Sequence, residues 1–548
     1  MRICCALLLV ALFHPQLKAQ GPSWLWAQGY GSAGQDRSRA ICADGNGGFY
    51  LTGYFTGTGI TIGGTALTNT QSNNSADLFL SRVAADGSFL WTARIGGTGS
   101  QAGVSVASDA QGRVVLTGTY ENTITIGTTT LTSAGGADVF VAKFDADGTA
   151  LWAVSMGGAA SDDVSDLAVG PDGRVAVAGT FAGAGFTAGG ITLVNADPGD
   201  EDLYVVMLDG TGNVLWADAA GGAFDDTAAS VCIDAGGNVI MGGFFATAAI
   251  QFGGFTLTNA NDNYNDLLLV KYDADGAVLW AKRAGGPRHE RIWAVACHAN
   301  GDIAVAGGFI DATLVIDGTE LTNTNSDQSW YDAFVARFNG DGVLLWAVSG
   351  GGIYDEFVTA VDVDAAGNTV LAGDFDGPQA AFGGLTLTNV EDYDAFVVQF
   401  DPSGNASWAR SAGGGNGDRT QSVACGTNGT VALTGYSTSE PLAFGSHQVM
   451  NNGDADLWLA LLGIAAGLPD AAANGTLRAY PGIGSGAVRI TSAAAMHELR
   501  VIDAGGRTVV RTAPMAPVAD LELSVPGCYT VLARTAQGTA RTRVAVVR

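Results

Sequence analysis

Aromatic and charged side chains that interrupt a regular sequence pattern are the residues best placed to bind a ligand. Several such residues stand in predicted loops between positions 264 and 393, and one short segment there, 287–291, carries both signs of charge. The candidate site consists of Tyr264, Trp330, Tyr331, Tyr354, Tyr393, His289 and Arg291. Aromatic faces bind sugar rings or cationic groups, and neighbouring acids accept hydrogen bonds from hydroxyls. The alternative is that these rings only pack loops onto the scaffold.

A column of acidic residues provides a second group of candidates. An acid, or in one case Gln101, lies ten residues after each of seven regularly spaced tryptophans. The acids are Asp36, Asp162, Asp226, Glu290, Glu356 and Asp418. They could ring the mouth of a channel and hold a cation, but charges about 10 Å apart in water repel by only ~0.4 kcal/mol, so a solvated ring needs no metal. The alternative is that each acid accepts hydrogen bonds from backbone N–H groups of its loop.

Sequence motifs for catalysis or tight metal binding are absent. There is no His-Glu-x-x-His and no Gly-x-Ser-x-Gly, and the five histidines are scattered. Turns such as 145–148 (Asp-Ala-Asp-Gly) contain two acids, but an EF-hand also needs ligands at alternate positions and a closing Glu. The chain continues Thr-Ala-Leu-Trp after that turn. We therefore predict no catalytic residues, no metal and no cofactor, with calcium as the alternative for the acidic turns.

These candidates sit on a unit that repeats seven times. The seven tryptophans are spaced 61 to 66 residues apart: Trp26, Trp91, Trp152, Trp216, Trp280, Trp346 and Trp408. A glycine follows each tryptophan by 27 residues, and an aspartate precedes the next tryptophan by 14 residues. Repetition at a fixed period is the sequence signature of a repeat architecture. All the variation in length lies between the glycine and the aspartate.

Each repeat is predicted to contain four strands and an inserted hairpin. In the second repeat the expected strands are 104–107, 114–120, 138–144 and 150–155, separated by turns rich in Asp and Gly. Four-stranded units arranged around an axis form a β-propeller. The sequence therefore predicts an all-β fold with a seven-bladed β-propeller over residues 20–465 and a ligand on the face that carries the inserts. The last repeat lacks an outer strand, which the N-terminal strand 24–29 is expected to supply.

The repeats resemble the SBBP-type β-propeller repeat family. The pattern stands here as Gly351-Gly352, Asp355, the turn 364–368 and Asp-Ala-Phe-Val at 394–397, and the resemblance covers roughly residues 24–464. It implies the fold, whereas propellers host many activities. We predict a binding or adhesion module for a glycan or protein ligand. A carbohydrate-active or quinoprotein-like propeller enzyme and a purely structural surface protein are the alternatives.

The composition changes after the repeats. A linker at 466–478 leads into residues 479–548, where several short strands predict a small C-terminal β-sandwich. This region resembles the type A C-terminal sorting domain of the type IX secretion system of Bacteroidetes, through Tyr480-Pro481, the segments 501–507 and 526–529, and the basic end. Gly482 and Ile483 stand where that family has Asn-Pro. The resemblance implies the type IX secretion machinery as a partner, followed by surface attachment or release.

The N-terminus and the overall charge fit an exported protein. Residues 1–19 have the charged start, short apolar run and small-residue end of a signal peptide. Acids outnumber bases, 53 to 26, which argues against a nucleic-acid partner because phosphates need a basic surface. No segment is long and apolar enough to be a predicted transmembrane helix. We expect the mature protein to be extracellular or on the outer-membrane surface after export to the periplasm.

Five cysteines follow the signal peptide: Cys42, Cys232, Cys297, Cys425 and Cys528. An odd number is unfavourable for a disulfide framework. The first four fall on the same predicted strand of four different repeats. Equivalent positions in separate repeats are expected to lie beyond the ~7 Å limit between Cα atoms for a bridge. The sequence therefore predicts small buried thiols and no disulfide.

Overall fold

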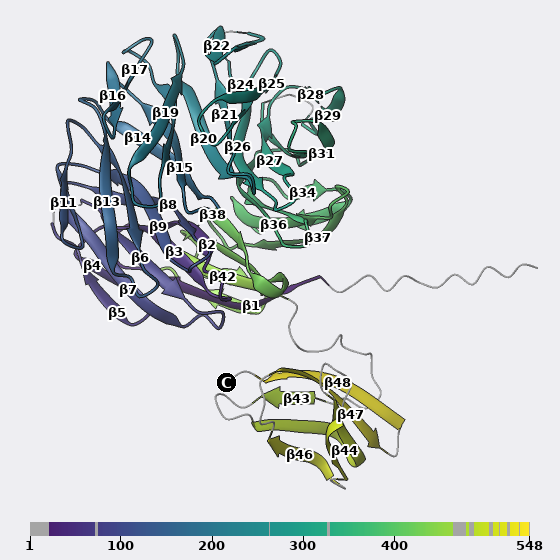
Figure 1. Cartoon of the computed structure of the whole chain (residues 1–548). Helices are drawn as coiled ribbons and strands as arrows, with labels where there is room; N and C mark the ends of the chain where they lie inside the picture. The colour runs from purple at the N-terminus through teal and green to yellow at the C-terminus, as the bar shows by residue number, and fades with distance from the viewer. Residues whose placement is uncertain are drawn as a thin grey trace, which may run out of the picture. The chain divides into compact units, whose positions relative to one another are not determined.

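The computed structural model describes residues 21–71, 75–261, 264–325 and 329–463, together with strands of the C-terminal region between 478 and 546. The chain divides into two compact units, of which one is Trp24–Gly463 and the other holds the two chain ends (Figure 1). The described elements are β-strands apart from one 3₁₀ turn, η1 (Thr427–Gly429). The predicted signal peptide and the linker as far as residue 477 lie outside the described residues.

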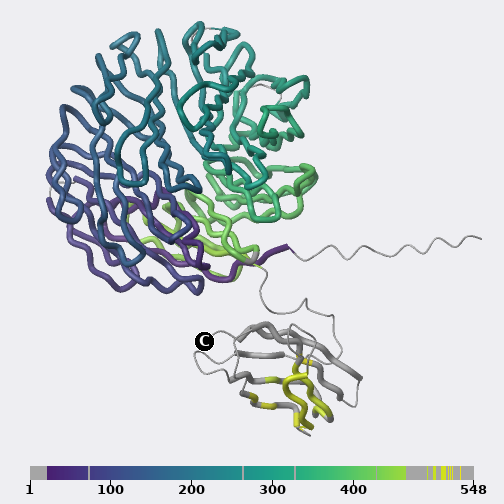
Figure 2. The backbone as a smooth tube through the Cα atoms, in the orientation of Figure 1, coloured from purple at the N-terminus to yellow at the C-terminus, as the bar shows by residue number. Residues whose placement is uncertain are grey.

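The prediction of a seven-bladed β-propeller is confirmed. The chain runs once around the ring, as the colours of the tube show (Figure 2), and each blade has four antiparallel strands. The innermost strands are β2 (Asp36–Ala43), β8 (Gln101–Ser108), β14 (Asp162–Val169), β20 (Asp226–Ile233), β26 (Glu290–Cys297), β32 (Glu356–Val363) and β38 (Asp418–Cys425). The second strands are β3 (Phe49–Phe55), β9 (Val114–Tyr120), β15 (Val175–Phe181), β21 (Val239–Phe245), β27 (Ile303–Phe309), β33 (Thr369–Phe375) and β39 (Val431–Ser437).

The third and outer strands complete the blades. The third strands are β6 (Asp77–Val83), β12 (Asp138–Phe144), β18 (Asp202–Leu208), β24 (Asp266–Tyr272), β30 (Asp332–Phe338), β36 (Asp394–Phe400) and β42 (Asp456–Gly463). The outer strands are β7 (Phe89–Thr98), β13 (Ala150–Gly157), β19 (Val214–Ala220), β25 (Val278–Ala284), β31 (Leu344–Gly351), β37 (Ala406–Ala412) and β1 (Ser23–Tyr30). We number blades 1 to 7 in the order of the innermost strands.

The seventh blade takes strands from both ends of the propeller. Its sheet runs β1-β42-β39-β38, so the N-terminal strand is its outer strand. The ring of Trp24 packs edge-on against Phe444 at 4.9 Å, and Leu25 and Trp26 pack on the core between blades 7 and 1. Without β1, the third strand β42 would present an unpaired edge.

The tryptophan column exists because it fastens each blade to the next. Five of the seven indole N–H groups donate to a carbonyl in the third-to-outer-strand turn of the following blade at 2.9 to 3.3 Å, as from Trp91 to Ala146, and Trp26 does the same to Ala85. Each of these six rings covers the glycine of that turn, such as Gly148, where a Cβ would come within about 3 Å of the indole. The indole N–H of Trp408 donates to the side chain of Gln399 instead. The following blade is blade 7, whose outer strand comes from the N-terminus, so that blade has no turn between its third and outer strands.

The glycine column is explained by a β-bulge. Each innermost strand has an extra residue at its fourth position. In β2 this residue is Arg39, which lies between the paired residues Ser38 and Ala40. The bulge turns the carbonyl of the second residue toward the neighbouring strand. A Cβ on the column glycines, which include Gly53 and Gly118, would meet that carbonyl oxygen at 1.9 to 2.2 Å. Only glycine fits there, and the bulged residue is redirected toward the propeller axis.

The inserted hairpins lie between the outer strands of adjacent blades. They are β4 (Gly59–Ile62) with β5 (Thr65–Thr68), β10 (Thr123–Ile126) with β11 (Thr129–Thr132), β16 (Gly185–Ala188) with β17 (Ile191–Val194), β22 (Ala249–Phe252) with β23 (Phe255–Thr258), β28 (Thr313–Ile316) with β29 (Thr319–Thr322), β34 (Gln379–Phe382) with β35 (Leu385–Thr388), and β40 (Leu442–Phe444) with β41 (His447–Val449). Strand β10, for example, pairs with β7 of the preceding blade. Alternate apolar residues such as Ile124 and Ile126 are buried, so the hairpins fill the wedge-shaped gaps that open between blades toward the rim.

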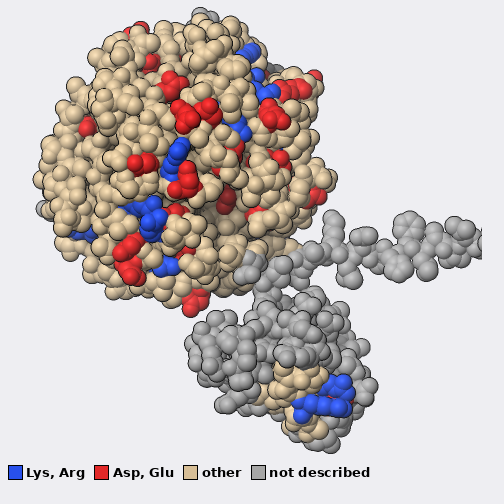
Figure 3. Space-filling view, in the orientation of Figure 1, with Lys and Arg blue, Asp and Glu red and all other residues tan. Residues whose placement is uncertain are grey.

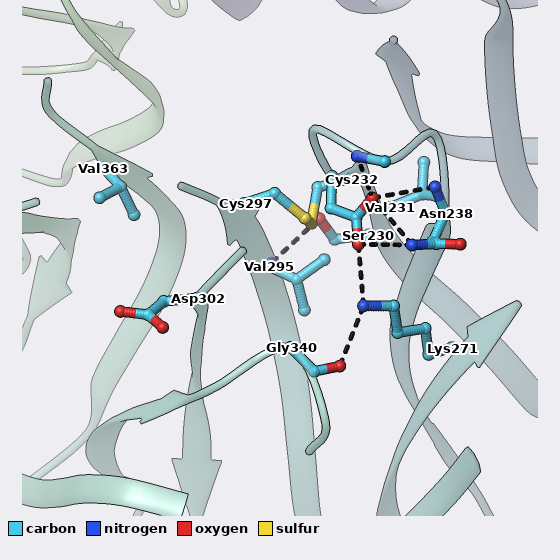
Figure 4. The surroundings of a disulfide bond; sticks show 12 residues. Ser230, Val231, Cys232, Asn238, Lys271, Val295, Cys297, Asp302, Gly340 and Val363 are labelled. Atoms are coloured by element: carbon cyan, nitrogen blue, oxygen red, sulfur yellow. Dashed lines mark hydrogen bonds and ion pairs between the residues drawn. A yellow bond between two sulfur atoms is a disulfide. The ribbon is translucent and has the colours of Figure 1, made fainter. Parts of the chain in front are cut away.

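The prediction that no disulfide forms was wrong. Cys232 and Cys297 are bridged, with their Cα atoms 5.8 Å apart (Figure 4). Innermost strands of adjacent blades converge on the axis and touch, so equivalent positions there are much closer than positions farther out. In the bridged pair the seventh residue of one strand meets the eighth residue of the next strand around the ring.

The other two cysteines of this column, Cys42 and Cys425, are free. They also lie on adjacent blades, but their order is reversed, since Cys425 is an eighth residue and Cys42 is the seventh residue of the next strand. Cys425 instead meets Asp362, the seventh residue of the preceding strand, whose carboxylate accepts its backbone N–H at 2.7 Å. The side chain of Cys528 lies outside the described residues.

In the C-terminal region the described strands form one hydrogen-bonded network. They are β43 (Arg478–Pro481), β44 (Ala487–Ile502), β45 (Thr508–Thr512), β46 (Ala516–Glu522), β47 (Gly527–Thr535) and β48 (Gly538–Val546). The long strand β44 pairs with four of the others. The described part of the chain contains no helix that is long and apolar enough to cross a membrane. The sandwich arrangement stays a prediction.

Candidate binding site at the mouth of the axial channel

The innermost strands enclose an axial channel with a cavity of about 370 Å³. Its lining includes all seven bulged residues, which are Arg39, Val104, Ser165, Ala229, Trp293, Thr359 and Gln421. Arg39 donates to the side chain of Gln421 across the junction of blades 1 and 7 at 3.3 Å. Six of the seven are small or flexible, whereas Trp293 places a large ring against the channel. The scaffold repeats, but the channel wall does not.

Aromatic rings form a continuous series over blades 5 and 6, on the side of the bulged residues where the innermost strands begin. The ring of Tyr331 lies 5.4 Å from that of Trp293 and 5.8 Å from that of Phe357. Phe357 in turn contacts Tyr393 at 6.2 Å. All four side chains are half-buried, so each keeps part of its surface open to solvent. The structure thus brings two predicted site residues, Tyr331 and Tyr393, into one cluster.

Arginines extend this series to both sides. The guanidinium of Arg291 lies 4.7 Å from the ring centre of Phe244 and 6.0 Å from that of Tyr331. Arg419 stacks on Tyr393 at 3.4 Å. On the next blade Arg37 stacks on Tyr436 at 4.2 Å. In each case the second residue of an innermost strand covers a ring of the preceding blade, and such cation–π contacts fix the plane of the guanidinium.

We call this series the mouth arc. Its members are Phe244, Arg291, Tyr331, Trp293, Phe357, Tyr393, Arg419, Tyr436, Arg37, Tyr54 and Arg39, from blades 4, 5, 6, 7 and 1. Blades 2 and 3 close the ring with small or acidic residues at the same positions, where Ala102 faces Thr119 and Asp163 faces Thr180. The mouth therefore has an aromatic and basic wall on one side and, on the other, a wall of small side chains with one acid, Asp163.

The remaining predicted aromatic residues form two separate pairs. Trp330 contacts Tyr354 edge-on at 5.7 Å, and both are more than one-third exposed. Tyr264 lies 4.9 Å from His289, whose Nδ1 accepts the backbone N–H of Asn265 at 3.2 Å. Burial and the nearby Arg291 lower the pKa of His289. Ring contacts place the predicted site residues in three groups and not in one patch.

The acidic column does not line the channel. All six acids and Gln101 are at most 1% exposed, and several accept the backbone N–H four residues earlier in the preceding loop. Gly158 donates to Asp162 at 2.6 Å, Gly97 to Gln101 at 3.0 Å and Gly286 to Glu290 at 2.9 Å. The side chains are buried because they turn into the junction between blades to meet these loops.

Burial also changes the protonation of this column. It raises the pKa of Glu356 to about 10 and that of Glu290 to about 8. The values are about 7 for Asp162 and Asp226 and about 6 for Asp36 and Asp418. In most of these junctions, the negative charge of the aspartate that begins the neighbouring third strand adds to the effect. The pKa values above 7 favour the neutral form of Glu356 and Glu290 at pH 7.

The acidic turns are held by their own first residue. Oδ1 of Asp145 accepts the backbone N–H groups of Asp147 and Thr149 at 3.0 and 2.8 Å, which is the ordinary use of Asp in a tight turn. Among the described residues, no group of three or more His, Cys, Asp or Glu side chains has the arrangement of a metal site.

Sequence reasoning missed Trp293, Phe357 and Arg419, although the signal was present. At the fourth position of the innermost strands only one residue is aromatic, and at the second position three are arginines. Comparing repeats at these two positions would have shown the asymmetry. The bulge that directs the fourth residue to the axis becomes recognisable only once the glycine column is explained.

No protein-family model matches the sequence. An uncharacterised WD repeat-containing protein of Acanthamoeba polyphaga mimivirus is 21% identical over 458 residues, which are 70% of this chain and 32% of that protein. The regulatory protein FlaEY of Caulobacter vibrioides is 28% identical over 109 residues, 20% of this chain and 11% of that protein. The chain thus matches about a third or less of the length of either relative.

Similar solved structures include Sqt1 from Chaetomium thermophilum, with a TM-score of 0.36 and 9% identity over 82% of this chain and all of that chain. Another is PorZ, a surface component of the type IX secretion system of Porphyromonas gingivalis, with a TM-score of 0.17 and 10% identity over 95% of this chain and all of that chain. A third is an extracellular domain of a proposed hybrid two-component system of B. thetaiotaomicron, with a TM-score of 0.18 and 9% identity over 97% of this chain and all of that chain.

Proposed function

We propose that this chain is a secreted or cell-surface β-propeller that binds a glycan or protein ligand at the mouth arc. The observation that carries the proposal is the break in sevenfold symmetry: the tryptophan, glycine and acidic columns serve every blade alike, whereas the arc occurs once and spans five blades. Partly exposed aromatic and arginine side chains that converge on a concavity are typical of binding hot spots. The Cys232–Cys297 bridge favours an oxidising compartment, where disulfides persist.

Replacing two rings of the arc should abolish binding. We expect the double variant Trp293→Ala, Tyr393→Ala to lose about several hundredfold in affinity for a ligand found by a glycan and protein-partner screen of the full chain, since aromatic anchors contribute about 2 kcal/mol or more each and about 1.4 kcal/mol is a tenfold change in affinity. Affinity would be measured by calorimetry, with the melting temperature recorded for each variant.

A matched variant tests the position of the site. Trp330→Ala with Tyr354→Ala also removes two rings, but from the pair outside the arc, and should leave affinity unchanged. Loss of binding in this variant, with retention in the first, would move the site to the exposed pair. Product release from the identified ligand would instead favour an enzyme.

We further propose that the C-terminal region carries the export signal. A chain lacking residues 469–548 should fold and accumulate in the periplasm of a host with the type IX machinery, because the propeller is a compact unit of its own. Cell fractionation followed by immunoblotting would locate the protein. Secretion of the shortened chain at the normal level would contradict the sorting role.

A further inference from the structure

The mouth arc concentrates positive charge in a strongly acidic protein. The chain has a net charge of −27 with only 26 basic residues, yet four arginines, Arg37, Arg39, Arg291 and Arg419, lie at the first four positions of three innermost strands. Figure 3 shows basic and acidic side chains interspersed over one face of the propeller. Repeat symmetry does not require these arginines, because Ala102 and Thr227 hold the second position in other blades.

These arginines are largely without carboxylate partners. Of these four arginines, only Arg419 forms a salt bridge with a described residue, with Asp374 at 3.3 Å. Arg291 has a neutral partner, since the amide oxygen of Asn265, when turned toward it, accepts from Nε and Nη2 at 2.8 and 2.9 Å. The Nε of Arg37 is buried and has no hydrogen-bond partner. That atom is too enclosed for a ligand to reach, so an acceptor for Arg37 would bind at its Nη groups.

The geometry selects the kind of acceptor. A guanidinium held flat against a ring has a fixed plane, and the N–H groups that have no partner among the described residues, such as those on Nη1 of Arg291, can donate within that plane to a carboxylate or sulfate oxygen. Beside it, the rings of Trp293, Phe357 and Tyr393 offer apolar faces of the sort that pack against sugar rings. The surrounding acidic surface repels a long polyanion, so an acidic unit at a chain end or on a short oligomer fits best.

We propose that the mouth arc binds an acidic saccharide, with its anionic group on Arg37 and Arg291 and its sugar ring against the aromatic wall. This inference rests on the binding function proposed above and names the ligand class for that site. A uronate carboxylate and a sulfate ester share the required chemistry.

The test is calorimetric titration of the full chain with four probes: an oligogalacturonate, its neutral galactose oligomer, a sulfated galactose oligomer and an oligoglutamate. Binding of the uronate or the sulfated oligomer, at least tenfold tighter than the neutral oligomer and weaker at higher salt, would support the proposal and identify the anionic group. Equal binding of acidic and neutral sugars would overturn the charge requirement while leaving a glycan-binding function. Equal binding of oligoglutamate would overturn the saccharide assignment. Binding of none would overturn the acidic-saccharide proposal, and the protein-partner screen would then decide the broader function.

Single substitutions of arginine test which guanidinium groups bind the anionic group of the saccharide. Arg37→Gln and Arg291→Gln should each weaken binding of the acidic oligomer about tenfold and leave any weak binding of the neutral oligomer unchanged. Neither leaves a buried carboxylate unpaired, whereas Arg419→Gln would isolate Asp374 and could prevent folding. Arg174→Gln is the matched control, because it makes the same change in net charge at a surface salt bridge with Asp172, in the turn at the opposite end of the innermost strands. Unchanged affinity in both arc variants would overturn the assignment.

Discussion

A chain without residues 21–30 should melt on the order of 10 °C lower than the full chain. The deletion removes β1, so blade 7 loses its outer strand and β42 loses its hydrogen-bonding partner. It also exposes Phe444, which Trp24 covers, and removes Leu25 and Trp26 from the core between blades 7 and 1. Deleting several partly buried large side chains costs a few kcal/mol, and the ring is no longer closed by strands from both ends. Thermal unfolding followed by circular dichroism would measure the change.

A circular permutant provides the matched control. In blades 1 to 6 a short Asp-Gly turn joins the third strand to the outer strand, and in blade 7 this connection is missing because β42 ends at Gly463 and β1 begins at Ser23. Moving residues 23–30 to follow Gly463 through such a turn should restore the melting temperature. An unchanged melt after the deletion, or no recovery in the permutant, would contradict the closing role of β1.

The sequence predicted the repeated part of the structure well, for a physical reason. Features that recur in six or seven blades, such as Trp91 over Gly148 or the glycines facing the bulge carbonyl, leave columns at fixed offsets. Strand bounds in the second repeat agree closely, with β9 and β12 matching the expected 114–120 and 138–144. Binary patterning and turn residues are local properties, so one sequence suffices to find them.

Distances between neighbouring innermost strands could not be found in this way. Cys232 and Cys297 are 65 residues apart, and their contact depends on how closely the innermost strands converge. The mouth arc depends on the same convergence together with the bulge that turns Trp293 inward. The acidic column was visible as a pattern, but whether it faced water or a blade junction depended on side-chain direction, which spacing alone does not give.

Stability should rise as the pH falls from 9 to about 5. Burial raises the folded-state pKa of Glu356 to about 10 and of Glu290 to about 8, above the usual value for Glu. An acid with a raised folded-state pKa keeps its proton in the folded chain after the unfolded chain has lost it. Its stabilising contribution is therefore complete below the unfolded pKa and is lost as the pH rises through the folded value. Salt-bridged acids such as Asp109, whose pKa is lowered, act oppositely and limit the gain at lower pH.

Replacing an acid of this column by an amide, and the amide by an acid, should change stability at pH 8 in opposite directions. The chain already has an amide at one junction, where Gln101 accepts the loop N–H as the acids do. At pH 8 the folded chain keeps the proton of Glu356 and the unfolded chain has lost it, so Glu356→Gln removes the cost of taking up that proton on folding. Both carboxylate oxygens of Glu356 lack a hydrogen-bond partner, so no such bond is lost. We expect this variant to gain a few kcal/mol at pH 8, at most about 5 kcal/mol, and almost nothing at pH 4, since each pH unit above the unfolded pKa costs the parent about 1.4 kcal/mol. Gln101→Glu should lose stability at pH 8 and match the parent at pH 4.

Urea unfolding at both pH values would measure the two variants side by side. Because they change the same kind of junction in opposite directions, a general effect of mutation cannot produce the expected pair of signs. If Glu356→Gln were destabilising at pH 8, the carboxylate would be charged in the folded state and balanced by a cation, and the ring of acids would have to be considered again as a cation site. Addition of calcium would then stabilise the parent chain more than the variant.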